Sequence, residues 1–212
     1  MKIVAIIPIK NKSVRVPGKN FKKIGGKPLY KFTLEKLKKC NFDEVYVDTD
    51  SDEIKKYCRR NKINIINRLT RLSKNTANGN DLLNYHSKII DADLYFQMFI
   101  TAPLLKISTI NKCVEILKKS KKHDSILTVR SLYTWFWFRK KPINYDPRIL
   151  PRSQDAQPVI VETTALYGIK KHTLKKRKCR IGFKPYFYET PEKECIDLDN
   201  KKDFDYLNYV IK

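Results

Sequence analysis

The sequence predicts an α/β fold with a mostly parallel sheet and helices on both faces, built as one domain over residues 1–212. The chain opens with an apolar, largely β-branched run at 2–8, which is typical of a strand buried on both faces. Runs of this kind then alternate with helical patterns up to about residue 130, and such alternation generates parallel strands. The length of 212 residues suits a single domain, and no internal repeat or linker divides it.

The strands and helices can be placed in order along the chain. Pro28 opens a helical pattern that continues to Leu37, because proline suits the first turn of a helix. Ser51 caps the next helix, which has acidic residues in its first turn, and Ser108 begins a later one. The expected strands are 2–8, 44–49, 63–66, 94–100, 124–129 and 160–169. The expected helices are 28–37, 52–61, 81–90, 108–119 and 203–211.

The alternation of strands and helices weakens after residue 130. The segment 133–138 is strongly aromatic, and 142–158 contains four prolines. We therefore expect residues 131–158 to form a long irregular excursion, inserted late in the chain. The aromatic segment 133–138 could serve as a platform on which a sugar stacks, or it could form part of a subunit interface. We favour the interface and expect a homodimer, because so apolar a surface is unfavourable in water.

The cysteines and the apolar runs indicate the class of protein. The chain has five cysteines, an odd number with no C-x-x-C pair, which argues against a disulfide framework and a zinc site. Free thiols favour a reducing, cytoplasmic location. The N-terminal run is too short and too polar at its end for a signal peptide. No stretch approaches the roughly 20 apolar residues of a membrane span, so we expect no membrane contact.

The formal charge of +23 is compatible with nucleic-acid binding. The lysines, however, are spread over the whole chain on expected helix faces and turns. We therefore favour biased composition together with a small anionic substrate, and we do not expect a nucleic-acid partner.

The loop after the first strand, residues 9–20, is the first candidate binding element. Ligands of open α/β sheets bind beyond the carboxyl ends of the strands, and this loop holds four cations there. It is suited to a triphosphate and to the charge of a leaving pyrophosphate, although it is not a Walker loop. A solvated basic turn is the alternative. The candidate nucleotide-binding residues of this loop are Lys10, Ser13, Arg15, Lys19 and Asn20.

Two sets of polar residues near the end of the chain are further candidates. Asp197 and Asp199 alternate on an expected strand, so both carboxylates could face one magnesium ion. A surface D-x-D ahead of a helix is the alternative, and Asp48 and Asp50 are a rival pair. Arg152, Gln154 and Glu162 form the second set. An arginine there can pair with a substrate carboxylate or form a structural salt bridge.

Six motifs lie in a fixed order along the chain. They are IIPIKNKSVRVPGKNFKKIGGKPL at 6–29, VDTD at 47–50, TAPL at 101–104, RSQD at 152–155, ETTALY at 162–167 and IDLD at 196–199. Together they resemble the pattern of the acylneuraminate and 3-deoxy-manno-octulosonate cytidylyltransferases.

The resemblance implies a Rossmann-like sheet and a homodimer formed through the late insertion. It implies transfer of CMP from CTP to an acidic sugar, with release of pyrophosphate and with Mg²⁺ bridging the phosphates. The implied catalytic residues are Arg15, Lys19, Asp197 and Asp199, and both aspartates are the implied metal ligands. Thr101 joins the nucleotide-binding loop residues, and Arg152, Gln154 and Glu162 are the implied substrate-binding residues.

The sequence departs from the family pattern around the base and sugar pockets. Lys10 stands where the family has arginine, Phe99 where it has glutamine, and Thr163 and Thr164 where it has asparagine and glycine. Two other functions therefore stay open: a cytidylyltransferase acting on a phosphonate or phosphate acceptor, and a catalytically inactive relative that binds nucleic acid or another protein.

Overall fold

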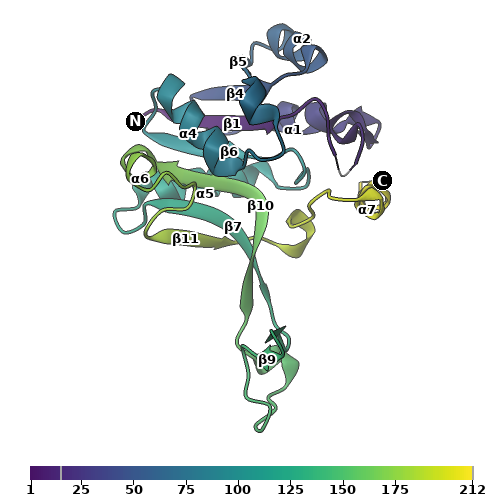
Figure 1. Ribbon diagram of the computed structural model, residues 1–212, viewed down its shortest axis with the longest axis vertical. Coiled ribbons are helices and arrows are strands. Elements are labelled where there is room, and N and C mark those ends of the chain that lie inside the picture. The colour runs from purple at the N-terminus through teal and green to yellow at the C-terminus, as the bar shows by residue number, and fades with distance from the viewer. Residues whose placement is uncertain (15, 212) are drawn as a thin grey trace.

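The protein is built around a seven-stranded sheet with the strand order β11-β7-β10-β6-β1-β4-β5 (Figure 1). The computed structural model describes residues 1–14 and 16–211. Every neighbouring pair in the sheet is parallel except the two made by β10, which runs antiparallel to β6 and β7. The mostly parallel sheet is therefore confirmed. The strands are β1 (Ile3–Ile9), β4 (Glu44–Thr49), β5 (Asn64–Asn67), β6 (Leu94–Met98), β7 (Ser125–Leu132), β10 (Val159–Lys170) and β11 (Pro185–Glu189).

Helices cover both faces of the sheet because successive side chains of a buried strand point in opposite directions. In β1, Ile7 belongs to one apolar cluster and Ile6 to another. The Ile7 cluster includes side chains of α1 (Leu29–Leu37), α2 (Asp52–Arg60), α5 (Ile107–Lys119) and α7 (Lys201–Val210). The Ile6 cluster includes side chains of α4 (Gly79–Ile89) and α6 (Lys171–Arg177). Each face of the central strand is thus buried, as the continuous apolar run predicts.

All five expected helices form, and each begins within two residues of its expected start. Ser51 caps α2 as expected, its hydroxyl accepting a hydrogen bond from the Ile54 amide. Helix α4 begins at Gly79, two residues before the expected start, because Asn78 and Asp81 form a reciprocal capping box. Helix α5 begins at Ile107, so the expected start at Ser108 is wrong by one residue. Strand β11 and the short helix α3 (Thr70–Ser73) were not expected from the sequence.

Residues 131–158, named the arm below, project from the sheet at the ends of β7 and β10 (Figure 1). The two strands stay paired as they leave the sheet, with Leu132 opposite Val159. A short hairpin of β8 (Trp137–Phe138) and β9 (Lys141–Pro142) follows. The Asn144 side chain ties it together by donating to the carbonyls of Thr134 and Gln157. The expectation that residues 131–158 are irregular is therefore wrong for the paired strands at the base of the arm and for the β8–β9 hairpin. The position of the arm in the chain agrees with the sequence.

No helix among the described residues is long and apolar enough to cross a membrane.

Candidate active site

The basic loop lies beyond the carboxyl end of β1 and is fixed by polar contacts with its neighbours. The buried Asn20 side chain donates to the Lys10 carbonyl at 2.5 Å. The Asn11 amide donates to Asp50 Oδ1 at 2.6 Å, and Lys10 Nζ donates to Asn75 Oδ1 at 2.8 Å. Gly18 adopts a left-handed conformation with φ of 65°, which glycine tolerates at little cost. These contacts hold Lys10, Asn11 and Asn20, near the two ends of the loop, in place.

Lys19 connects this loop to the end of the chain. It begins the short 3-10 helix η1 (Lys19–Phe21), and its Nζ donates to the Leu198 carbonyl at 2.6 Å. The same Nζ lies 3.6 Å from Asp199 Oδ1, with the lysine side chain only 11% exposed. The Leu198 amide in turn donates to the Thr101 carbonyl at 2.9 Å. Three segments far apart in the sequence, each expected to contribute to a site, therefore meet at Leu198.

Arg15, predicted to bind nucleotide and to take part in catalysis, lies outside the described residues. Ser13 is on the same loop and is partly buried.

Asp197 is fixed by the strand across from it. Its Oδ2 accepts a hydrogen bond of 2.6 Å from the Thr164 hydroxyl. Thr164 lies in β10 between Glu162 and Tyr167, where the pairing register with β7 shifts. It has a left-handed backbone with φ of 55°. A β-branched residue rarely adopts this conformation, and strain of this kind clusters at functional sites.

The surroundings of Asp197 and Asp199 bear on the magnesium site expected from the sequence. Asp197 Oδ1 is buried without a hydrogen-bond partner among the described residues, an acceptor that a cation would satisfy. Asp199 is 44% exposed on its side chain, and its Oδ1 lies 3.6 Å from Lys19 Nζ. The described residues contain no group of three or more metal-ligating side chains. Two carboxylates are nevertheless enough, because magnesium keeps several of its waters and is shared with substrate phosphates.

The expectation that these two aspartates lie on a strand is wrong. Residues 195–199 form no strand, and the segment is held by the Leu198 contacts with Thr101 and Lys19. Asp197 contacts β10, whereas Asp199 pairs with the basic loop.

The rival pair, Asp48 and Asp50, has other partners. Asp48 is fully buried, with Oδ1 accepting from Arg68 Nε at 3.2 Å and Oδ2 lying 2.9 Å from His86 Nε2. Burial raises the pKa of Asp48, but the His86 hydrogen bond and the Arg68 charge outweigh it and lower the pKa overall. Asp50 accepts from the Asn11 amide and the Ser73 hydroxyl. These contacts indicate that the rival pair anchors loops.

The predicted substrate-binding residues are divided between two places. Arg152 and Gln154 lie on the arm, where Arg152 Nε donates to Asp155 Oδ2 at 2.6 Å and both predicted residues are exposed. Glu162 stands near the base of the arm. It lines an open pocket of about 620 Å³ together with Thr164 and Asp197. Within one protomer, the structure therefore brings Glu162, but neither arm residue, to the Asp197 pocket.

Arg180 is a site residue that sequence analysis missed. It lies after α6, and its guanidinium carbon stacks 3.6 Å from the centre of the Tyr167 ring. Its Nη2 lies 3.8 Å from Glu162 Oε2, which also accepts a hydrogen bond from the Tyr167 hydroxyl at 2.5 Å. Arg180 belongs to none of the six sequence motifs. The packing of its loop against β10 brings its side chain to Glu162.

The sequence profile of the cytidylyltransferase family matches residues 4–204, nearly the whole chain. The chain belongs to the cytidylyltransferase family. This confirms the resemblance drawn from the six motifs.

Individual members of the family show moderate identity to the chain. An N-acylneuraminate cytidylyltransferase of Streptococcus agalactiae serotype V is 26% identical over 219 residues, covering 96% of this chain and 52% of the relative. N-acylneuraminate cytidylyltransferase A of Danio rerio is 27% identical and covers 93% and 48%. A 3-deoxy-manno-octulosonate cytidylyltransferase of Fusobacterium nucleatum is 30% identical over 122 residues, covering 57% and 48%. The chain thus spans about half the length of these relatives.

Solved structures share the fold at low sequence identity. A CMP:2-keto-3-deoxy-manno-octonic acid synthetase complexed with CTP superposes with a TM-score of 0.74 at 15% identity, covering 100% of this chain and 98% of the other. A 4-diphosphocytidyl-2C-methyl-D-erythritol synthase from Anaerococcus prevotii gives 0.73 at 14% identity, with coverage of 99% and 96%. The Rossmann-like nucleotidyltransferase fold implied by the resemblance is therefore confirmed.

Proposed function

We propose that the protein transfers CMP from CTP to an acidic sugar and releases pyrophosphate. The observation that carries this proposal is the meeting of Lys19, Thr101 and the 197–199 segment around Leu198. Lys19 and Asp199 thus lie together beyond the carboxyl end of β1, the edge of a parallel sheet where such folds bind nucleotides, and this supports the proposal. Membership of the cytidylyltransferase family supports CTP as the nucleotide.

The proposed reaction joins the acceptor hydroxyl oxygen to the α-phosphorus of CTP and breaks the bond between that phosphorus and the bridging oxygen of the β-phosphate. The hydroxyl proton passes to water, and pyrophosphate leaves. Lys19, with Arg15 and Lys10 on the same loop, binds the triphosphate and offsets the charge that develops on the leaving pyrophosphate. Asn20 holds the loop in shape through the Lys10 carbonyl. Asp197 and Asp199 would hold Mg²⁺, which supplies charge neutralisation and alignment of the phosphates.

An acidic sugar is proposed as the acceptor because the similar curated proteins are named for such sugars. Their names specify N-acylneuraminate or 3-deoxy-manno-octulosonate. Glu162 borders the same pocket as Asp197, in a position to accept hydrogen bonds from sugar hydroxyls. All five cysteines are unpaired, which supports the proposed cytoplasmic location.

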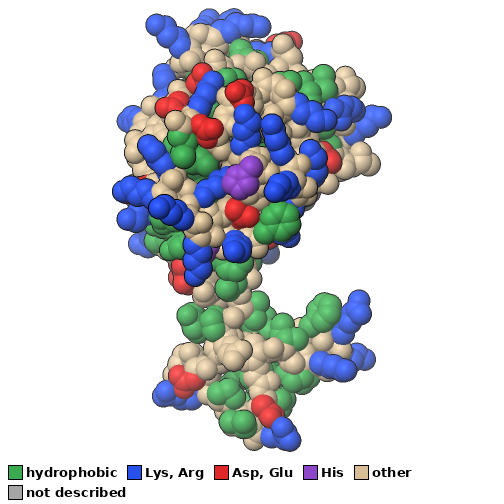
Figure 2. Space-filling view, turned by 90° about the vertical axis from the view of Figure 1, so that its left-hand side faces the viewer, with side chains coloured by type: hydrophobic (Ala, Val, Ile, Leu, Met, Phe, Trp, Pro, Cys, Tyr) green, Lys and Arg blue, Asp and Glu red, His purple; other side chains and the backbone are tan. Residues whose placement is uncertain are grey.

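A homodimer is proposed through the arm. Figure 2 shows apolar side chains gathered on it below the globular part, and Trp137 and Phe138 are 58% and 61% exposed. Such a surface is suited to burial against a second copy. Arg152 and Gln154 project on this arm, so in a dimer they could reach the substrate of the other subunit.

The experiment compares the four nucleoside triphosphates with Mg²⁺ by thermal shift, and then measures pyrophosphate release with CTP and candidate sugars. A ligand that binds the native state raises the melting temperature, so CTP should raise it most. Turnover with an acidic sugar and CTP is the expected result. A preference for a purine nucleotide, or salt-sensitive DNA binding without turnover for any acceptor, would contradict the proposal.

A further inference from the structure

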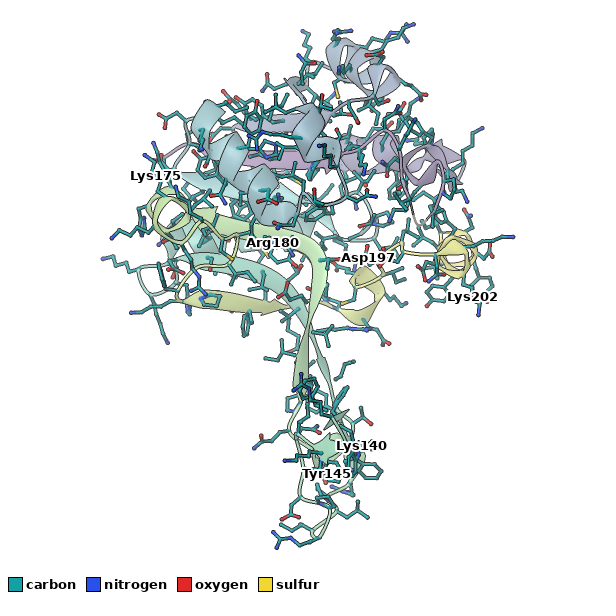
Figure 3. The ribbon with its side chains drawn as sticks, viewed as in Figure 1. Lys140, Tyr145, Lys175, Arg180, Asp197 and Lys202 are labelled. Atoms are coloured by element: carbon teal, nitrogen blue, oxygen red, sulfur yellow. The ribbon has the colours of Figure 1, made fainter. Side chains whose placement is uncertain are left out.

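A second polar cluster lies against the face of the sheet that α4 covers. Gln97 in β6 and Tyr167 in β10 are directly opposite each other in the pairing register. Arg180 stacks on the Tyr167 ring, and its guanidinium carbon lies 5.8 Å from the centre of the Phe99 ring. Figure 3 labels Arg180 and Asp197. Arg180 Nη2 lies 3.8 Å from Glu162 Oε2, and Glu162 lines the same pocket as Asp197, so the cluster adjoins the proposed active site.

The guanidinium of Arg180 has unused hydrogen-bonding capacity. None of its nitrogens donates a hydrogen bond to a described residue, and its nearest ionic contact is the 3.8 Å approach to Glu162 Oε2. Its backbone amide is held by Asn80 Oδ1 at 2.9 Å, which fixes the loop. The side chain is 22% exposed, so a ligand can reach it. An arginine offers five N–H donors in a rigid fork, and here they make no hydrogen bond to an acceptor in residues 1–14 or 16–211.

Two acceptors complete the cluster. Gln97 is fully buried, and its Oε1 has no hydrogen-bond partner among the described residues. This oxygen and Arg180 Nη1 both border the space above the Gly79 α-carbon, 3.2 Å and 2.7 Å from where a β-carbon would lie. Glycine at this position thus lets the guanidinium and the Gln97 oxygen pack against the backbone of α4. Glu162 accepts through Oε2, while its Oε1 receives no hydrogen bond from a described residue.

The charges of the cluster indicate which chemical group it would bind. Glu162 partly neutralises Arg180, so the pair is a weak site for a second carboxylate. Free N–H donors beside free carboxylate and amide oxygens instead match hydroxyl groups, which donate and accept at once. The face of Tyr167 is covered by the guanidinium, which leaves it unavailable to the methyl group of an N-acyl substituent.

We propose that Arg180, together with Glu162, determines acceptor specificity by binding neighbouring hydroxyl groups of the sugar. The inference rests on the proposed function, and it specifies the substrate class. Hydroxylated acidic sugars without an N-acyl group, such as 3-deoxy-manno-octulosonate, are preferred over N-acetylneuraminate.

The test measures pyrophosphate release with saturating CTP and Mg²⁺ while the concentration of each of these two sugars is varied. The wild type should favour the octulosonate. Arg180→Met should raise the KM for the octulosonate by about 10- to 100-fold, the loss expected for hydrogen bonds to a charged group. The KM for CTP should stay within about twofold, since Arg180 is not assigned to the nucleotide. The preference between the two sugars should largely disappear.

Arg177→Met is the matched control. Arg177 lies on the same stretch of chain but donates to the Gly182 carbonyl and stacks on Phe183, so its loss should leave both sugars unaffected. Glu162→Gln keeps the shape of the pair and should also raise the KM for the octulosonate. A wild-type preference for N-acetylneuraminate would overturn the proposal. So would an Arg180→Met variant that melts far lower and loses both sugars and CTP equally.

A separate measurement distinguishes failure of the subsite from failure of the proposed function. If the wild type releases no pyrophosphate with either sugar, saturation-transfer NMR of each sugar with the protein tests the subsite directly. Octulosonate signals that appear with the wild type and vanish with Arg180→Met support it. Absence of signals with the wild type refutes it.

Discussion

The Thr164 hydroxyl donates a 2.6 Å hydrogen bond to Asp197 from a backbone with φ of 55°. A β-branched residue in this region of conformational space costs about 1–3 kcal/mol. The family pattern has glycine at this position, which would carry no such cost. We infer that the threonine persists because its hydroxyl fixes Oδ2 of Asp197 and so directs Oδ1 toward a cation.

Substitution of Thr164 separates backbone strain from metal binding. Thr164→Gly should unfold at the same or a higher temperature, because the strain is relieved. Its affinity for Mg²⁺ should fall severalfold, because Asp197 is no longer oriented. The measurement is a Mg²⁺ titration of the CTP-induced thermal shift, which needs no turnover.

Two further substitutions at Thr164 serve as controls. Thr164→Ser keeps the hydroxyl and should bind Mg²⁺ as the wild type does. Thr164→Val keeps the strain and should lose both stability and metal affinity. Normal Mg²⁺ affinity in Thr164→Gly would show that the hydrogen bond is dispensable.

Asp197→Asn and Asp199→Asn should each abolish most turnover and leave the fold intact. Asparagine keeps the shape of the side chain and removes the charge that a hard cation needs. Turnover and the Mg²⁺ dependence of CTP binding are the measurements. Near-normal rates of turnover in both variants at limiting Mg²⁺ would show that the metal binds elsewhere.

Asp48→Asn should behave in the opposite way, with a loss of stability of about 3–5 kcal/mol, because it leaves Arg68 buried without its counter-charge. The lowered pKa of Asp48 means that its contribution is full above about pH 4 and is lost as the pH falls further. The free energies of unfolding of wild type and variant should therefore become equal as the pH falls. A difference that stays constant down to pH 2 would show that Asp48 is not stabilised by its charged partners.

Lys19→Met should lower the rate by about 10²–10³, because a cation matched to the leaving pyrophosphate is lost. Its side chain is only 11% exposed and donates to the Leu198 carbonyl, so we expect a modest decrease in melting temperature as well. Arg15→Ala is the companion variant. Melting curves and turnover are compared for both, and an unchanged rate would remove Lys19 from the mechanism.

Replacing Trp137 and Phe138 on the arm with serine should give a monomer. Both rings are more than half exposed in the single chain, 58% and 61%, and a second copy would bury them. Light scattering measures the mass, and Ile89→Ser is a control that removes a 51% exposed apolar side chain from the globular part. A monomeric wild type would overturn the dimer, as would an unchanged dimer in the double variant.

The sequence by itself determined the strands of the sheet except β11, and the parts of the site that lie close together along the chain. The buried run of β1, the Ser51 cap and the basic loop all follow from neighbouring residues. Local patterns are readable because the periodicity of strands, the capping of helices and the clustering of like charges act over a few residues.

Only the tertiary structure decided which distant residues meet. Asp48 and Asp197 are both aspartates near the expected carboxyl edge, yet one is buried between Arg68 and His86 while the other keeps an unpaired oxygen. The strained backbone of Thr164 and the stacking of Arg180 on Tyr167 likewise have no local signal. Such contacts depend on how loops from separate strands pack at one edge of the sheet, and that packing is set by the whole core.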